Sequence, residues 1–184
     1  MRHRKSVLLA AALVSVLVVA AAQAAPALAN PWYIQAKLAE GSTAQLLNAS
    51  GCGNPAQIVQ YPYTPGATCP GGGSNQLWST TNGNWPTFTD TAIYASYGGR
   101  NMCMNIKGNS YASGTPVIAY ACNPSSPAGN EVWLIHPFPG GYEIQAANDT
   151  ALCLNIKGGF GQGHAIILYE CTGAANEQFV PDQP

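Results

Sequence analysis

The chain has 184 residues and a formal net charge of −1 at pH 7, with 20 glycines, 14 prolines and only 8% charged residues. This length accommodates a single domain, and the lack of a basic excess excludes an electrostatic surface for nucleic acid. Frequent Gly, Pro, Asn and Thr disfavour helices and favour many short strands joined by tight turns.

The N-terminal segment has the pattern of a secretory signal peptide. The basic residues 2–5 precede an uncharged apolar stretch over residues 7–22, and Ala27-Leu28-Ala29 provides a small-x-small cleavage site. A membrane anchor is an alternative, because the apolar stretch is long enough to span a bilayer. The cleavage site instead favours a signal peptide of residues 1–29, with an earlier cut after Ala24 as a second alternative.

Removal of this segment would leave a secreted, extracellular chain of residues 30–184 that forms one domain. Three of the seven Lys and Arg residues lie in the signal peptide, so four cations remain against eight acids, a net charge of −4. A mildly acidic chain repels nucleic acid and offers no polybasic patch to a membrane. The six dispersed cysteines of a secreted chain indicate disulfides and, without a Cys-x-x-Cys pair, predict no metal site.

The mature chain is predicted to contain three related segments, of which the first covers about residues 31–80. Its apolar runs are Tyr33–Ala36, Leu46–Asn48 and Ile58–Tyr63, and it closes with Asn75-Gln76-Leu77-Trp78. The run at 33–36 resembles Tyr142–Ala146 further along the chain with a shift of one residue. This anchor aligns the first segment with the two later ones at a period of roughly 50 residues.

The second and third segments, about residues 90–135 and 141–180, are more alike. Met102-Cys103-Met104-Asn105-Ile106-Lys107-Gly108 matches Leu152-Cys153-Leu154-Asn155-Ile156-Lys157-Gly158. Each continues through a Gly-rich loop to a Tyr-x-Cys triplet, at 120–122 and 169–171. Each then closes with Asn-Glu-x-aromatic, at 130–133 and 176–179.

Each segment is predicted to form four short strands, at about 142–146, 151–155, 165–169 and 177–180 in the third. Three segments then give twelve strands, and an all-β closed architecture leaves no exposed sheet edge. A solenoid is the alternative for repeats of this length, but a solenoid needs capping segments and the sequence contains none. The pattern therefore favours closure around a pseudo-threefold axis.

These motifs resemble the repeat of the ricin-B-type lectins, the QxW β-trefoil family. The resemblance covers about residues 31–180 and implies a β-trefoil of three pseudo-symmetric four-stranded repeats. It also implies extracellular binding of glycans or polysaccharides by a monomer without a cofactor. The alternative function is a protein-binding or inhibitory trefoil with degenerate sugar pockets, in which the Gly-rich loop at 64–75 would contact the partner.

The resemblance also implies disulfides. The intrarepeat bridge of the family corresponds to Cys103–Cys122 and Cys153–Cys171. The matching positions of the first repeat are Leu46 and Tyr63, so that bridge is absent there. Cys52 and Cys69 lie in the loops just after those positions and are predicted to pair with each other, with free or intermolecular thiols as the alternative.

The family's sugar sites correspond to three kinds of position in this chain. An aromatic ring forms a platform that stacks on the C–H face of a sugar, a polar floor residue bonds its hydroxyls, and the Asn of the closing motif bonds either sugar or loop. The alternative for each tyrosine is a half-buried strand residue with its hydroxyl in water. The candidate residues are Tyr61, Asn48 and Asn75 in repeat one, Tyr120, Asn105 and Asn130 in repeat two, and Tyr169, Asn155 and Asn176 in repeat three.

The floor position carries Asn in all three repeats, where sugar-binding members usually carry Asp. The loss of a charge-assisted acceptor predicts weak sites. Repeats two and three place Glu131 and Glu177 where the family has Gln, so an Asp–Gln pair has become an Asn–Glu pair. We expect Asn155 and Glu177 to be within hydrogen-bonding distance of each other.

The remaining signature residues have structural or minor roles. Trp78, Trp133 and Phe179 are predicted to lie in the core near the pseudo-threefold axis. His136 and His164 are the histidines of the mature chain, and His164 is a candidate polar contact near the third pocket. The sequence has no Gly-x-Ser-x-Gly or His-Glu-x-x-His motif, so no enzymatic activity is expected.

Overall fold

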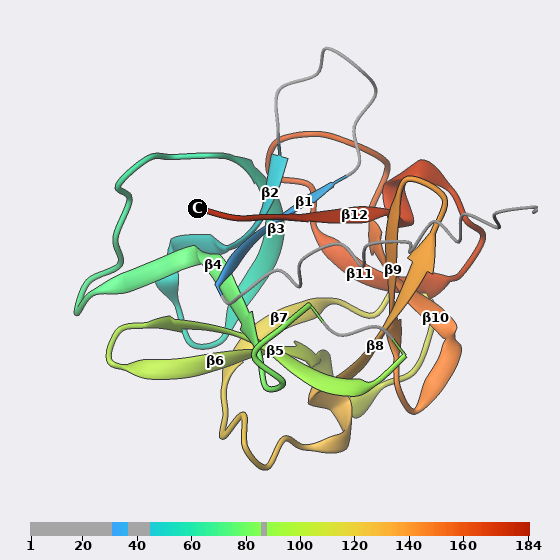
Figure 1. Ribbon diagram of the computed structural model, residues 1–184, viewed down its shortest axis with the longest axis horizontal. Coiled ribbons are helices and arrows are strands. Elements are labelled where there is room, and N and C mark those ends of the chain that lie inside the picture. The colour runs from blue at the N-terminus through green and yellow to red at the C-terminus, as the bar shows by residue number, and fades with distance from the viewer. Residues whose placement is uncertain (1–30, 37–44, 86–87) are drawn as a thin grey trace, which may run out of the picture.

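Twelve short strands and four single-turn 3₁₀ helices form the part of the chain that the computed structural model describes, residues 31–36, 45–85 and 88–184 (Figure 1). The predicted signal peptide lies outside these residues. The strands of the first repeat are β1 (Trp32–Ala36), β2 (Gln45–Ala49), β3 (Ala56–Pro62) and β4 (Gly73–Thr80). Those of the second are β5 (Asp90–Tyr97), β6 (Arg100–Ile106), β7 (Val117–Ala121) and β8 (Val132–Phe138). Those of the third are β9 (Gly141–Ala146), β10 (Asp149–Ile156), β11 (Ile166–Glu170) and β12 (Phe179–Asp182).

The strands pair antiparallel in a closed arrangement. The last strand, β12, pairs with the first strand, β1, and β8 bridges β5 and β9, while β1 also pairs with β4. This pairing confirms the predicted twelve-stranded all-β fold, and the β1–β4 pairing covers the strand at one end of the order. In the third repeat β12 begins two residues later than predicted, because Ala175–Glu177 form the 3₁₀ helix η4, which Glu177 caps.

Equivalent strands of the three repeats pair in the same register. The second strand of each repeat pairs with the third, so that the floor Asn lies opposite a β-branched residue and the platform Tyr lies two residues further along. This agreement confirms the alignment of the divergent first repeat. The pairs are Asn48 with Val59, Asn105 with Ile118 and Asn155 with Ile167.

A single side-chain amide lies where the third strands β3, β7 and β11 meet. Gln57 Nε2 donates to the carbonyl oxygens of Ile58, Val117 and Ile166 at 3.1, 3.0 and 3.2 Å. These three carbonyls occupy equivalent positions, three residues before each platform tyrosine. Gln57 therefore marks the pseudo-threefold axis and connects all three repeats through one nitrogen atom.

The closing aromatic residues Trp78, Trp133 and Phe179 are fully buried, as predicted. The indole N–H of Trp78 donates to the Leu47 carbonyl and that of Trp133 to the Met104 carbonyl, both at 2.9 Å. The two tryptophans thus fill the core and also satisfy a backbone acceptor of the second strand of their own repeat.

All three predicted disulfides are present. Cys103–Cys122 and Cys153–Cys171 join equivalent positions of the second and third repeats. Cys52–Cys69 connects the short helix η1 (Ser50–Cys52) to the long loop before β4. Each closes a loop of 17 to 19 residues, a length for which cross-linking of the unfolded chain contributes about 3 kcal/mol.

Candidate functional site

The three predicted platform tyrosines are exposed and occupy equivalent positions on the third strand of each repeat. Tyr61, Tyr120 and Tyr169 are 40%, 47% and 45% exposed, although most residues around them on these strands are buried. A large ring left exposed at the same place in three repeats provides three equivalent aromatic faces at the surface. Such a face is what a sugar ring stacks on.

In the second repeat a buried hydrogen-bond network ties the floor residue to the closing motif. Asn105 Nδ2 donates to Glu131 Oε1 at 3.1 Å, and Asn130 Nδ2 donates to Asn105 Oδ1 at 3.1 Å and to the Ile106 carbonyl at 2.9 Å. The other carboxylate oxygen of Glu131 accepts the N–H of Ala128 at 2.9 Å. Both ends of the Asn105 amide are therefore engaged inside the protein.

The third repeat has the same network with more donors on its carboxylate. Asn155 Nδ2 donates to Glu177 Oε1 at 3.0 Å, which confirms the expected Asn–Glu contact, and Asn176 Nδ2 donates to Asn155 Oδ1 at 3.1 Å. Glu177 also accepts from the N–H groups of Thr172 and Ala174 and from the Thr172 hydroxyl. These bonds compensate for the burial of the carboxylate, which is only 1% exposed.

In the first repeat the network is broken. Gln76 takes the place of the glutamate, and its side chain bonds backbone groups instead, with Nε2 donating to the Pro62 carbonyl and Oε1 accepting the Thr64 N–H. Asn75 Nδ2 donates to the Ala49 carbonyl at 2.8 Å, the same structural bond that Asn130 and Asn176 make. Across residues 31–36, 45–85 and 88–184, the Asn48 side-chain amide has no hydrogen-bond partner in the protein, and its atoms are not among the buried unpaired ones.

A cavity of about 350 Å³ opens over this unpaired amide, and we call it the repeat-one pocket. Asn48 and Gln76 line it with Asn75 and Thr64, and the exposed ring of Tyr61 forms one side. The volume suits a small ligand. Sequence comparison of the repeats finds Asn48, Tyr61 and Asn75 but not Thr64, and it does not single out this pocket. The one available signal is Gln76 in place of Glu131 and Glu177.

The hydrogen bonds and ring contacts of His136 and His164 are with other residues than these amides. Nδ1 of His164 contacts the Gly159 carbonyl at 2.7 Å, and its backbone carbonyl accepts the N–H of Gln60 on β3, so this loop of the third repeat packs on the first repeat. The ring of His136 packs edge-to-face on Phe88 with centroids 5.0 Å apart. Within the described parts of the chain, no His, Cys, Asp and Glu side chains cluster in a way that could bind a metal ion.

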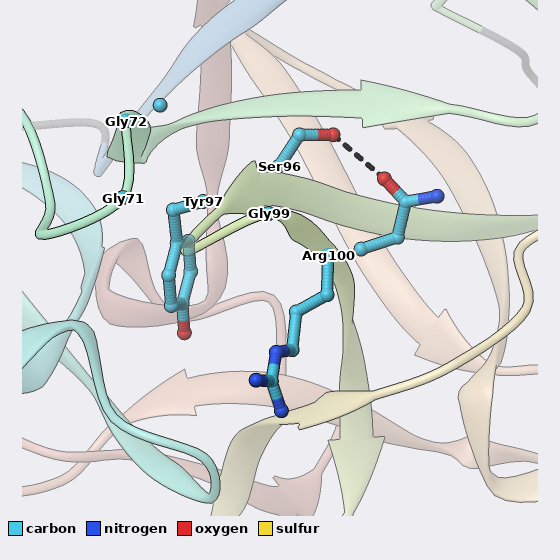
Figure 2. Close-up of a pocket in the computed structure, with 8 residues that line it drawn as sticks. Gly71, Gly72, Ser96, Tyr97, Gly99 and Arg100 are labelled. Atoms are coloured by element: carbon cyan, nitrogen blue, oxygen red, sulfur yellow. Dashed lines mark hydrogen bonds between the residues drawn. The ribbon is translucent and has the colours of Figure 1, made fainter.

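A second hollow, of about 390 Å³, lies where β5 turns into β6 (Figure 2). Figure 2 shows Arg100 extending from this turn, away from the Ser96–Asn101 hydrogen bond of 2.8 Å. Tyr97 is buried and its hydroxyl donates to the Gly53 carbonyl at 3.1 Å, and burial raises its pKa to about 12. The hollow is therefore polar, and its tyrosine presents no open ring face for stacking.

Solved structures with the same fold include several lectins. The designed threefold-symmetric protein ThreeFoil is 19% identical, with a TM-score of 0.66 over 84% of this chain and 99% of that one. A ricin B-like lectin of Macrolepiota procera in complex with lactose is 20% identical, with a TM-score of 0.60 over 85% and 96%. The C-half of an earthworm R-type lectin in complex with GalNAc is 18% identical, with a TM-score of 0.58 over 84% and 98%.

These identities are low, so the similarities establish a shared β-trefoil fold and no more. No match is found among curated protein sequences. None of the described helices is long and apolar enough to cross a membrane.

The family model of the ricin-type β-trefoil lectin domain matches residues 53–179, more than half of the chain. The chain therefore belongs to the ricin-type β-trefoil lectin domain family.

Proposed function

We propose that this protein is a secreted carbohydrate-binding domain of residues 30–184, and that the repeat-one pocket is its principal site. The observation that carries the proposal is the Asn48 amide, which has no partner in the described part of the protein and lines the pocket beside the exposed ring of Tyr61. Lectins that share the fold are bound to lactose and GalNAc, which supports a glycan as the ligand class. No cofactor is required.

The pocket chemistry suits one sugar ring. Tyr61 would stack on the C–H face of the ring, while the Asn48 amide offers one acceptor and two donors to its edge hydroxyls. The amide atoms of Asn48 are not among the buried unpaired atoms, so a ligand would exchange their hydrogen bonds to water for bonds to its own hydroxyls. Because the floor residue is neutral, these hydrogen bonds lack charge assistance and the affinity for a single ring would be weak.

The second and third repeats would form weaker sites. Tyr120 and Tyr169 provide equivalent platforms, but the amides of Asn105 and Asn155 are already bonded to Glu131 and Glu177. Sugar hydroxyls would have to share acceptors that the protein already uses. A monomer with one principal and two minor sites would bind polymeric glycans by avidity.

A glycan array followed by calorimetry tests this ranking. Tyr61→Ala should reduce binding at least tenfold, because it removes the platform of the principal site, whereas Tyr120→Ala and Tyr169→Ala should reduce it less. Tyr61→Phe is the matched control and should retain most of the affinity, since stacking needs the ring and not the hydroxyl. Equal losses from all three alanine variants would overturn the ranking, and no glycan binding by the wild-type protein would overturn the function.

A further inference from the structure

We propose that the protein has an additional sugar site where the first and last strands pair, independent of the three repeat positions. The site is a cavity of about 320 Å³, here called the seam pocket, lined by Tyr33, Gln35, Leu46, Tyr63 and Asp182 with the C-terminal residues. The inference shares its ligand class, glycans, with the proposed function and rests on it in that respect.

The closure of the fold places the polar groups of the seam pocket together. Tyr33 on β1 lies opposite Asp182 on β12, and Gln35 lies opposite Leu46 on β2. Figure 1 shows β12 running alongside β1 towards the C-terminus. Tyr63 directly follows β3 and reaches the same cavity. The pocket therefore exists only because the two ends of the domain meet.

The seam pocket contains an accessible carboxylate, which the floor positions of the three repeats lack. Asp182 Oδ2 accepts a hydrogen bond from Gln35 Nε2 at 2.6 Å, which holds the carboxylate beside the aromatic rings. Its remaining lone pairs can accept from vicinal hydroxyls with charge assistance. A carboxylate held by an amide next to an open ring is the combination that Asn48, Asn105 and Asn155 cannot supply.

The two tyrosine rings of the seam pocket favour a ligand that has a flat apolar face. Tyr33 and Tyr63 contact each other edge to face, with centroids 5.0 Å apart and planes at 63°. Tyr63 is 47% exposed, so one ring face remains open, and the buried Leu46 adds apolar surface. One open face suits stacking on a pyranose ring, and it does not form the cage of several rings that encloses a quaternary ammonium.

The charge of the pocket narrows the ligand further. Asp182 is the charged side chain that lines it, and no Lys, Arg or His contributes among the lining residues. A sugar that carries a carboxylate or sulfate would be repelled by Asp182. This repulsion excludes acidic sugars, and stacking on a single ring face favours a neutral hexose or pentose unit over an ammonium ligand.

The seam pocket and the repeat-one pocket are separate sites. They share no lining residue, since Tyr61 and Thr64 line the repeat-one pocket while Tyr63 between them lines the seam pocket. Two neighbouring sites on one segment of chain would let a single glycan chain or two branches engage the same face. A variant of one tyrosine should therefore leave the other site intact.

Chemical shifts of backbone amides in the full mature chain, ¹⁵N-labelled, test the proposal. The probes are galactose, N-acetylgalactosamine, glucose, mannose, xylose and arabinose, each titrated to tens of millimolar, with glucuronate and choline as charged comparisons. We expect at least one neutral sugar to shift the amides of Gln35, Tyr63 and Asp182. Tyr63→Ala and Asp182→Asn should abolish these shifts or weaken binding at least fivefold, while Tyr63→Phe retains them and Tyr61→Ala leaves them unchanged.

Each outcome decides between the two sites. Sugar-dependent shifts confined to Asn48 and Tyr61 would overturn the seam site and leave the proposed function standing. Loss of the seam shifts in Tyr61→Ala would show that the seam is not independent, which also overturns the inference. A response to choline or glucuronate without a response to any neutral sugar would overturn the ligand class. Sugar-dependent shifts at the seam pocket alone would support the seam site and contradict the proposal that the repeat-one pocket is the principal site.

Discussion

Asn48, Asn105 and Asn155 occupy equivalent positions but differ in their hydrogen-bond partners. In repeats two and three the amide is held by a glutamate on one side and the closing Asn on the other. In repeat one Gln76 turns to the backbone and releases Asn48. The presence of Gln instead of Glu in the closing motif thus distinguishes Asn48, whose amide has no protein partner, from Asn105 and Asn155, whose amides are hydrogen-bonded.

The Asn–Glu pair of repeat two should behave as a coupled unit. Asn105→Asp alone would place two carboxylates about 3.1 Å apart in a buried site and lower the free energy of unfolding by about 1–3 kcal/mol. Glu131→Gln in the same chain restores one amide and one carboxylate, so the double variant should recover most of that loss. Urea unfolding of the two single variants and the double variant measures the coupling, and additive effects would contradict it.

Sequence reasoning reached part of this residue-level description. Alignment of the repeats identified the floor residues and predicted the Asn155–Glu177 contact, which the structure confirms. It could not predict that Asn130 and Asn176 occupy the remaining acceptor, because that depends on side-chain rotamers. The lack of a partner for Asn48 likewise depends on the rotamer of Gln76, which is set by its hydrogen bonds to nearby backbone groups.

At the scale of elements, the third strands of the three repeats meet around Gln57. Replacing Gln57 with Leu removes the donor shared by three carbonyl groups and should lower the free energy of unfolding by about 1–3 kcal/mol. Gln57→Glu should be worse at neutral pH, because a carboxylate would face three carbonyl oxygens. Thermal and urea unfolding check the order wild type, Leu, Glu, and equal stability of all three would contradict a role for this amide.

The strands themselves were largely predictable, since short β-branched and aromatic runs between Gly and Asn turns determine them. The third-repeat strands shift by one or two residues from the prediction where local bonds intervene, as at η4, where Glu177 caps the turn. The Cys52–Cys69 bridge was predicted from the absence of cysteine at the two family positions, and the structure confirms it. The seam pocket could not be predicted from any one repeat, because its residues come from both ends of the domain.

At the scale of the whole molecule, two tyrosines make the free energy of unfolding depend on pH in the alkaline range. Burial raises the pKa of Tyr97 to about 12, and burial together with Tyr63 raises the pKa of Tyr33 to about 12. In the unfolded chain these hydroxyls ionise near pH 10. The contribution of the neutral hydroxyls to the free energy of unfolding is therefore fully present below pH 10 and is lost as the pH rises from 10 to 12.

Tyr97→Phe should reduce this dependence, because the variant has one fewer group to ionise on unfolding. Its free energy of unfolding should be lower than that of the wild type at pH 9, since the bond to Gly53 is lost, but should fall less between pH 9 and 11. Urea unfolding at both pH values measures the difference. A parallel decline of the two proteins would show that Tyr97 does not titrate differently in the folded state.

The amide of Gln57 has a consequence for the symmetry of the three repeats. The equivalent positions in the other repeats are Pro116 and Ala165, neither of which carries a side-chain donor. Three glutamines would compete for the same axial space, and three residues without an amide would leave the central carbonyls without their common donor. Three identical copies of the repeat could not keep this arrangement, so this axial contact requires that one copy differ from the other two at this position.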